Sequence, residues 1–200
     1  MRDPYLYKDC DILKNKLNIK EQDLLNDAEA DYVTFRLKDL ALNPLKGDYH
    51  TGHFLAMHKY IFQDIFDWAG EPRSIAIYKE EGILQGQSVE YSDPFDIVRD
   101  IHFVLQDMRH KGWKKLTEEF CDSLARLWKI HPFREGNTRT TVTFCCQFAD
   151  EMGFPIDRKL FEDNAAYVRT ALVAYNAFFL DGTDFSKKEY LQRIVYDALR

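Results

Sequence analysis

The sequence predicts a mainly α-helical single domain with one small β-hairpin. Apolar residues recur at helical spacing through most of the chain, and alternation typical of β-strands is confined to residues 73–91. No repeat, low-complexity tract or linker divides the chain. The 200 residues include 46% hydrophobic residues, enough for a core of their own. We therefore treat 1–200 as one domain that begins with a short N-terminal segment, 1–20.

Two helices are predicted in the first third of the chain. Residues 21–41 are rich in helix-forming residues and follow a polar start. Residues 53–69 place apolar side chains on one helical face, and Gly70 and Pro72 are expected to end that helix. The apolar face consists of Phe54, Met57, Ile61, Ile65 and Trp68.

The predicted hairpin follows directly. Ser74 to Tyr78 alternate in polarity, Glu81 and Gly82 can form a turn, and apolar residues resume at Ile83. An isolated hairpin is marginally stable, and its free edge could pair with another extended chain. This segment is therefore a candidate docking edge.

The next two predicted helices lead to the most informative stretch of the sequence. Residues 93–109 form an amphipathic pattern. Thr117 is a plausible N-cap for a helix that buries Phe120, Leu124 and Trp128 and runs directly into His131.

Three further helices are predicted after residue 139. Helical spacing continues from Val142 to a stop at Gly153, and another helix covers about 163–179. The last helix begins at a capping box made by Ser186 and Glu189.

Composition excludes several classes of function. A net charge of −6 and a pI near 5.5 argue against a general nucleic-acid binder. No stretch approaches the roughly 20 apolar residues of a membrane helix, and the start lacks the apolar segment of a secretory signal. The cysteines show no zinc spacing and no dense disulfide pattern, so we expect reduced thiols in a cytoplasmic protein. They are Cys10, Cys121, Cys145 and Cys146.

Residues 131–139 bring together the groups of a phosphate site. Gly136 permits a tight turn at a helix start. The backbone amides of Gly136, Asn137 and Thr138 would then be unpaired first-turn donors, which together with the helix dipole attract an anion. Arg139 adds a permanent cation for phosphate oxygens.

The same stretch carries two groups suited to catalysis. Glu135 offers a hard oxygen ligand for Mg²⁺ that also touches phosphates. His131 titrates near neutral pH, as a general base should. A helix-start loop with a surface histidine and an ordinary Glu–Arg pair is the alternative interpretation.

These residues resemble the motif of the Fic family, within the larger Fic/Doc group. That motif reads His-x-Phe-x-(Asp/Glu)-Gly-Asn-Gly-Arg-x-x-Arg, and the stretch at 131–142 matches it at six positions. The residues in place are His131, Phe133, Glu135, Gly136, Asn137 and Arg139. The start, 3–17, resembles bacterial cell-filamentation Fic proteins, and 53–73 resembles the helix before the family's flap. The resemblance covers essentially the whole chain.

The resemblance implies a Fic-type helical bundle that transfers AMP from ATP to a Ser, Thr or Tyr hydroxyl of a target protein. His131 would be the general base and Glu135 would hold Mg²⁺. The anion hole would lie at 136–139. The hairpin at about 73–91 would be the flap beside the active-site loop.

The resemblance also assigns the two ends of the substrate site. Flap residues Ile77, Tyr78, Lys79 and Glu80 would pair with the backbone of the target. Tyr167 and Asn176 would lie near the adenine pocket, with the phosphates bound by Gly136, Asn137, Thr138 and Arg139.

Two departures from the motif leave the reaction open. Thr138 replaces the second glycine, where a side chain would narrow the anion hole and a β-branched residue resists unusual backbone angles. Val142 replaces the second arginine and removes a phosphate contact. Doc-type relatives carry lysine at position 138 and transfer the γ-phosphate. A Doc-like phosphotransferase and a catalytically degenerate binding module are therefore the alternatives.

Regulation is a separate question. Many family members are inhibited by a helix carrying (Ser/Thr)-x-x-x-Glu-(Gly/Asn), and this motif is absent from the sequence. A separate antitoxin could supply it, in which case the chain would be the toxin of a toxin–antitoxin pair. No direct nucleic-acid or membrane partner is expected.

His50, His53 and His58 could share a helical face, which makes a zinc site conceivable. Metal sites usually add a fourth group or a catalytic water. Capping and packing roles for these histidines are the competing interpretation.

Overall fold

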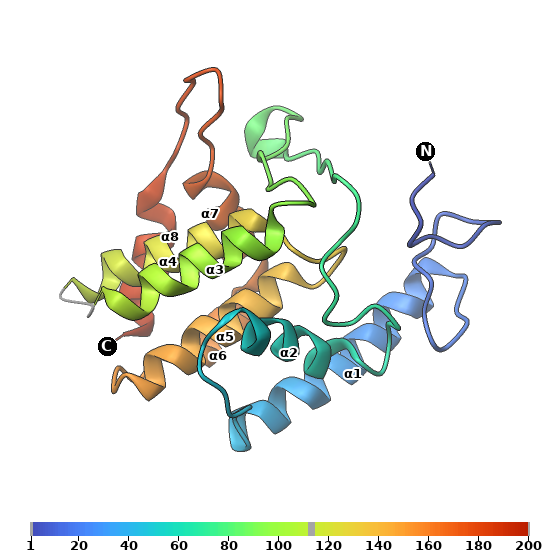
Figure 1. The fold of residues 1–200 in the computed structure, drawn as a ribbon, viewed down its shortest axis with the longest axis horizontal. Coiled ribbons are helices and arrows are strands. Elements are labelled where there is room, and N and C mark those ends of the chain that lie inside the picture. The colour runs from blue at the N-terminus through green and yellow to red at the C-terminus, as the bar shows by residue number, and fades with distance from the viewer. Residues whose placement is uncertain (1, 112–114, 200) are drawn as a thin grey trace.

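The computed structural model describes residues 2–111 and 115–199, and it is mainly helical, as predicted (Figure 1). Within these residues there are eight α-helices and one short 3₁₀ helix, η1. The helices are α1 (Gln22–Leu42), α2 (Thr51–Phe62), α3 (Ile97–His110), α4 (Leu116–Ile130), α5 (Asn137–Glu151), α6 (Arg158–Asp163), α7 (Ala165–Tyr175) and α8 (Lys188–Ala198), and η1 covers Gly82–Leu84.

Helices α4 and α5 form the centre of the bundle. Helix α4 packs against α3, α5, α7 and α8, and α5 packs in turn against α2 and α6 (Figure 1). Leu124, Leu127, Trp128 and Phe144 are completely buried there. Burial of each such side chain stabilises the fold by roughly 1.5–3 kcal/mol. The loop that joins α4 to α5 is consequently fixed in the middle of the protein.

The second predicted helix, 53–69, is shorter in the structure and ends at Phe62. Residues 63–69 continue as turns, with the amides of Ile65 and Phe66 bonded to the Phe62 carbonyl at 3.0 Å each. Phe66 and Trp68 are still buried. The apolar spacing in residues 63–69 therefore indicated which side chains are buried, and it did not indicate a helix.

Two predicted helix starts are wrong. Helix α4 begins after Lys115, so Thr117 lies inside it and is not its N-cap. Helix α8 begins after Lys187 without a side-chain cap, so Ser186 and Glu189 do not form a capping box. The amide of Ser186 bonds instead to the Asp184 carboxylate at 2.8 Å, a local turn that competes with the cap.

The helix predicted at about 163–179 corresponds to α7, which is shorter than predicted. Helix α6 precedes it and was not predicted, and α7 ends at Tyr175. Residues 177–187 then form a loop closed by one antiparallel bridge, between Phe178 and Asp184. The Asp157 side chain caps α6 through the Leu160 amide, a signal visible in the sequence.

The predicted β-hairpin at 73–91 is not confirmed. Within the described residues this segment contains no strand, only extended and turn conformations with η1 at its tip (Figure 1). The amide of Lys79 bonds to the Ser88 hydroxyl at 3.2 Å, and the amide of Glu81 bonds to the Gln87 carbonyl at 3.1 Å. Because a side chain replaces a backbone acceptor, no ladder forms. We keep the name flap for residues 73–91.

Two sequence-based expectations concern other features of the fold. Cys10, Cys121, Cys145 and Cys146 are free thiols. In the described part of the chain, no helix has the length and apolar character needed to cross a membrane.

Candidate active site

The loop from α4 to α5 depends on two residues with left-handed backbone conformation. His131 ends α4 at φ 51°, ψ 56°, and Gly136 precedes α5 at φ 79°. A Cβ atom at Gly136 would lie 2.3 Å from the Phe62 ring, so only glycine fits this approach. The turn brings the first amides of α5 back beside the end of α4.

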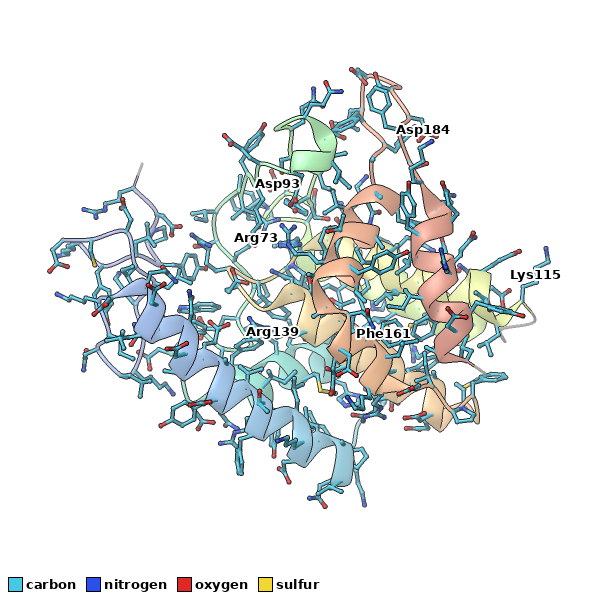
Figure 2. The ribbon with its side chains drawn as sticks, turned by 180° about the vertical axis from the view of Figure 1, so that it is seen from behind. Arg73, Asp93, Lys115, Arg139, Phe161 and Asp184 are labelled. Carbon is cyan, nitrogen blue, oxygen red and sulfur yellow. The ribbon has the colours of Figure 1, made fainter. Side chains whose placement is uncertain are left out.

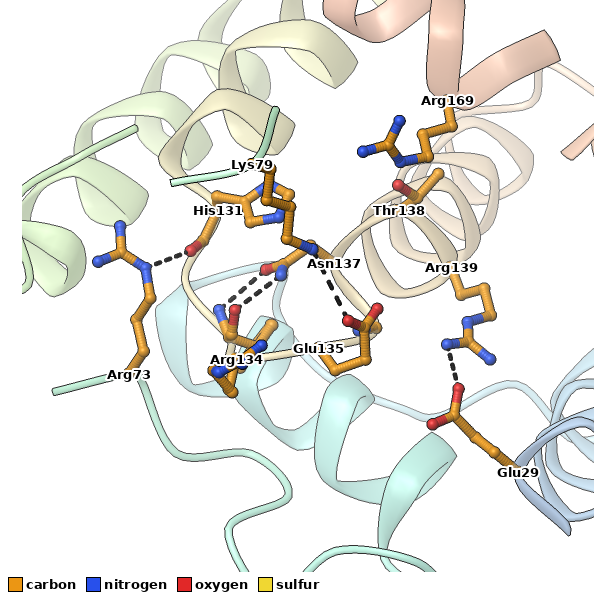
Figure 3. A network of polar contacts seen from close by, with 12 residues as sticks. Glu29, Arg73, Lys79, His131, Arg134, Glu135, Asn137, Thr138, Arg139 and Arg169 are labelled. Atoms are coloured by element: carbon orange, nitrogen blue, oxygen red, sulfur yellow. Dashed lines mark hydrogen bonds and ion pairs between the residues drawn. The ribbon is translucent and has the colours of Figure 1, made fainter. Parts of the chain in front are cut away.

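Asn137 closes the loop on itself. Its side-chain oxygen accepts from the Phe133 amide at 2.8 Å, and its side-chain nitrogen donates to the Phe133 carbonyl at 2.7 Å (Figure 3). The side-chain amide of Asn137 is therefore committed to the loop. Only its backbone N–H, in the first turn of α5, is available to an anion.

The histidines of α2 have structural roles, as the capping and packing interpretation predicted. His58 stacks on Phe133 with 3.7 Å between ring centroids, accepts from the Gly70 amide at 2.8 Å, and donates to the Glu135 carbonyl at 3.1 Å. His53 likewise bonds through both ring nitrogens, to the Tyr49 amide and the Leu45 carbonyl. These nitrogens are therefore not free for zinc.

His131 is the one histidine whose ring nitrogens are both buried without a hydrogen-bond partner among the described residues. Its side chain lies against Tyr91, with 4.1 Å between ring centroids, and against the edge of Trp128. Burial holds the pKa of His131 well below its usual range, and the nearby charges of Lys79 and Arg73 lower it further. The imidazole is thus neutral at physiological pH and can accept a proton.

Arg73 fixes the backbone of this histidine, and it was missed by the sequence analysis. Its guanidinium is buried and donates to the carbonyls of His131 at 2.8 Å, Ile75 at 2.6 Å and Ser92 at 2.5 Å. Its amide donates to the Pro132 carbonyl at 2.7 Å. One side chain thereby joins the loop between α4 and α5 to Ile75 in the flap and to Ser92 directly after it; Figure 2 labels Arg73, and Figure 3 shows its bond to the His131 carbonyl.

Glu135 lies in the same loop as His131, two residues before α5 begins. Its Oε1 accepts from the Gly136 amide at 3.0 Å, and its Oε2 lies 3.7 Å from Lys79 Nζ (Figure 3). Burial alone would raise the pKa of Glu135, but the Lys79 charge and the Gly136 amide outweigh it and lower the pKa. An ionised, partly exposed carboxylate of this kind fits Mg²⁺, which prefers one or two protein carboxylates and phosphate oxygens.

The two residues that follow Asn137 each have a side-chain partner. Thr138 Oγ1 accepts from the Trp128 indole at 2.9 Å, so its hydroxyl is held toward α4. Thr138 lies within regular helix, and the expected resistance of its backbone to unusual angles does not arise. Arg139 bonds to Glu29 of α1 at 2.5 Å (Figure 3) and lies 4.9 Å from the centroid of the Phe62 ring.

A second arginine reaches the start of α5 from α7, and the sequence analysis missed it as well. Arg169 extends toward Thr138 in Figure 3, and it forms a bidentate pair with Glu81 of the flap at 2.9 and 2.6 Å. Its charge lowers the pKa of His131 and interacts with Glu135. No motif marks Arg169, because its place in the site depends on how α7 packs.

Of the two predicted adenine-pocket residues, Tyr167 lines a cavity and Asn176 does not. The cavity, about 550 Å³, lies between the flap tip, α7 and the 177–190 segment. Its lining includes Leu84, Tyr167, Ala174 and Tyr190. Asn176 is buried and donates to carbonyls of α4 and α7, of Ala125 at 3.1 Å and Leu172 at 3.0 Å.

The predicted target-binding residues lie on the opposite arm of the flap. Ile77, Tyr78 and Lys79 line a polar groove of about 580 Å³, whose other wall includes Arg2, Asp3 and Arg134. Arg134 bonds to Asp3 at 2.8 Å. Glu80 is exposed and does not line this groove.

Two buried histidines should make the fold sensitive to mild acid. Burial lowers the pKa of His58 to about 3 and that of His131 well below 6.5. Between pH 6.5 and 4.5 the unfolded chain therefore binds more protons than the folded chain, and the free energy of unfolding decreases as the pH is lowered. The expected slope is up to about 1.4 kcal/mol per pH unit for each histidine.

Urea unfolding at several pH values between 6.5 and 4.5 measures this slope. His58→Gln should lower this slope by up to about 1.4 kcal/mol per pH unit, the contribution of one histidine. His102→Gln, which changes a histidine on the exposed side of α3, should leave it unchanged. An equal slope in wild type and His58→Gln would show that His58 is protonated in the folded state.

The chain is similar to known proteins along most of its length. A sequence profile described as the Fic/DOC family matches residues 48–149. A probable protein adenylyltransferase Fic from Escherichia coli K12 is 30% identical over 170 residues, which cover 82% of this chain and 80% of the relative. Protein adenylyltransferase VbhT from Bartonella schoenbuchensis is 29% identical over 78% of this chain, but only 32% of its own length is covered.

Solved structures share the fold. The BepC protein from Bartonella tribocorum, determined with bound AMPPNP, aligns with a TM-score of 0.79 over 97% of this chain and 95% of that chain, at 20% identity. An N-terminal Fic domain from Bartonella quintana with bound ADP aligns with a TM-score of 0.70 over 97% and 93% of the two chains, at 22% identity.

Proposed function

The chain belongs to the Fic/DOC family, and we propose that it is a protein adenylyltransferase, which transfers AMP from ATP to a hydroxyl group of a target protein. The observation that carries this proposal is His131. Its neutral imidazole is buried, and neither ring nitrogen has a partner among residues 2–111 and 115–199. It lies in the loop that also carries the ionised Glu135 and that leads into the first amides of α5, where a phosphate would bind.

The reaction follows from this arrangement. The target hydroxyl oxygen attacks the α-phosphorus of ATP, and its proton passes to a ring nitrogen of His131. A bond forms between that oxygen and the α-phosphorus, while the bond from the α-phosphorus to the bridging oxygen breaks and pyrophosphate leaves. The first amides of α5 stabilise negative charge on the α-phosphate oxygens without reorganising.

Glu135 would hold Mg²⁺, which neutralises charge on the phosphates when bound. Lys79 Nζ, now 3.7 Å from Glu135 Oε2, would move aside or contact a phosphate oxygen in its place. The base of ATP would enter the cavity that Tyr167 lines. This cavity is mostly apolar, as the lining of a nucleotide-base pocket should be.

The target would bind along the groove beside Ile77, Tyr78 and Lys79, and the exposed Glu80 follows these residues in the chain. Residues 76–78 lie outside regular secondary structure, and their amide and carbonyl groups would pair with a target segment. That segment would present a Ser, Thr or Tyr hydroxyl, and a separate antitoxin in the cytoplasm would restrain the enzyme as a toxin.

The position of a radioactive label on ATP tests the reaction. Purified protein with Mg²⁺ and a cell lysate as target pool should transfer label from α-³²P-ATP to protein, and not from γ-³²P-ATP. Chelation of Mg²⁺ should stop the transfer. Label from the γ position alone would establish a Doc-like phosphotransferase instead, and ATP binding without transfer of either label would indicate a binding module.

A further inference from the structure

We propose that Arg169 of α7 binds the phosphate groups of the nucleotide, as a cation supplied from outside the active-site loop. This inference deepens the proposed function and rests on it. It assigns a new role to a residue that lies 30 positions after Arg139 and is not part of the motif at 131–142.

The position of Arg169 supports this role. Arg169 extends from α7 over the first turn of α5, toward Thr138 (Figure 3). Its positive charge also contributes to the lowered pKa of His131, in agreement with this position. A guanidinium beside unpaired helix amides is the combination that phosphate sites use.

Arg169 also keeps hydrogen-bond donors that its pair with Glu81 does not use. Nη1 and Nη2 of Arg169 each donate one hydrogen bond to Glu81. The Nε–H and one further hydrogen on each Nη stay available, since a guanidinium has more donors than one bidentate carboxylate uses. The Arg169 side chain is 42% exposed, whereas that of Glu81 is 6% exposed. The carboxylate thus holds the arginine from its buried side and leaves its other edge open.

Arg169 also offers a positive charge that the motif position at Val142 does not provide. Val142, one turn beyond Thr138, lines an apolar groove and offers no positive charge. Arg139 is held by Glu29 and by the Phe62 ring. Pyrophosphate leaving needs cations near the developing charge. Arg169 supplies one from a different helix.

Calorimetric titration with ATP, ADP, AMP and adenosine tests this inference without measuring turnover. Arg169→Ala should weaken ATP binding about 10- to 100-fold, the loss expected for hydrogen bonds to a charged group. Adenosine binding should be unchanged. The ATP affinity of Arg169→Lys should lie between those of the wild type and Arg169→Ala, because lysine keeps the positive charge but lacks the paired N–H donors of the guanidinium. Arg36→Ala, which breaks a bidentate pair with Asp64 elsewhere, is the matched control and should bind ATP as wild type does.

Glu81→Gln separates phosphate binding from a structural role of the pair. If Arg169 binds phosphate, the Glu81→Gln variant keeps the positive charge of Arg169 in place, and its ATP affinity stays within about threefold of wild type. Equal losses in Arg169→Ala and Glu81→Gln, or equal weakening of ATP and adenosine, would mean that the pair only holds the flap and would overturn the inference. Unchanged ATP affinity in Arg169→Ala would also overturn it, with the proposed function intact. Failure of the wild type to bind ATP would overturn both.

Discussion

Replacing His131 with alanine is expected to lower AMP transfer by about 10²- to 10⁴-fold, the contribution of a well-placed general base. The fold should survive, because the His131 ring makes no hydrogen bond with any described residue. The loss of packing against Tyr91 and Trp128 would cost roughly 1–3 kcal/mol of unfolding free energy. Single-turnover transfer from α-³²P-ATP measures the rate, and thermal unfolding checks the fold.

Two controls make this result specific. His102→Ala changes a histidine on the exposed side of α3 and should transfer AMP at the wild-type rate. ATP affinity of His131→Ala should stay within about threefold of wild type, since a base acts on the chemical step and not on ground-state binding. Transfer at more than a tenth of the wild-type rate would assign the base to another residue.

The local parts of the site could be predicted from the sequence, because neighbouring residues create them. Gly136, Asn137 and the first turn of α5 lie within a few residues of His131, and their roles depend on backbone geometry near a helix start. Hydrophobic spacing likewise predicted α3 and α5, and helix-forming residues predicted α1, within a few residues of their bounds. Such patterns record burial on one face of a helix.

The parts that could not be predicted depend on contacts distant in sequence. Arg73 reaches the His131 carbonyl across 58 positions, and Arg169 reaches Glu81 across 88 positions. A lone arginine carries no local pattern that separates these roles from a surface position. The flap differs for a related reason, because its extended arms are held by Arg73 and Ser88 side chains and not by strand pairing.

The departure at position 138 can be interpreted in light of the same contacts. The hydroxyl of Thr138 is bonded to the Trp128 indole, which turns the side chain toward α4. The backbone at the start of α5 is regular helix, so the amides keep their direction. A threonine here is thus compatible with an anion site built from backbone donors. The departure at Val142 removes a cation, and the proposed role of Arg169 would supply another near the start of α5.

Replacing Arg73 with alanine is expected to destabilise the protein by roughly 2–4 kcal/mol and to lower AMP transfer at least tenfold. The substitution leaves the carbonyls of His131, Ile75 and Ser92 without their donor, and each unsatisfied buried acceptor costs about 1–3 kcal/mol. Part of this cost is offset, because burying the Arg73 charge is itself unfavourable, as its lowered pKa indicates.

Urea unfolding measures the first effect, and transfer from α-³²P-ATP measures the second. Arg99→Ala is the matched control, since Arg99 is an exposed arginine paired with Asp96 and Asp100, and its loss should change stability by less than about 0.5 kcal/mol. Arg73→Lys should recover only part of the stability, because a single ammonium cannot reach all of the carbonyls that a guanidinium spans. If Arg73→Ala keeps wild-type stability but loses transfer, the arginine positions His131 without stabilising the fold. If stability falls and transfer per folded molecule is unchanged, the position of the His131 backbone does not depend on Arg73, and the helix end alone fixes the catalytic histidine.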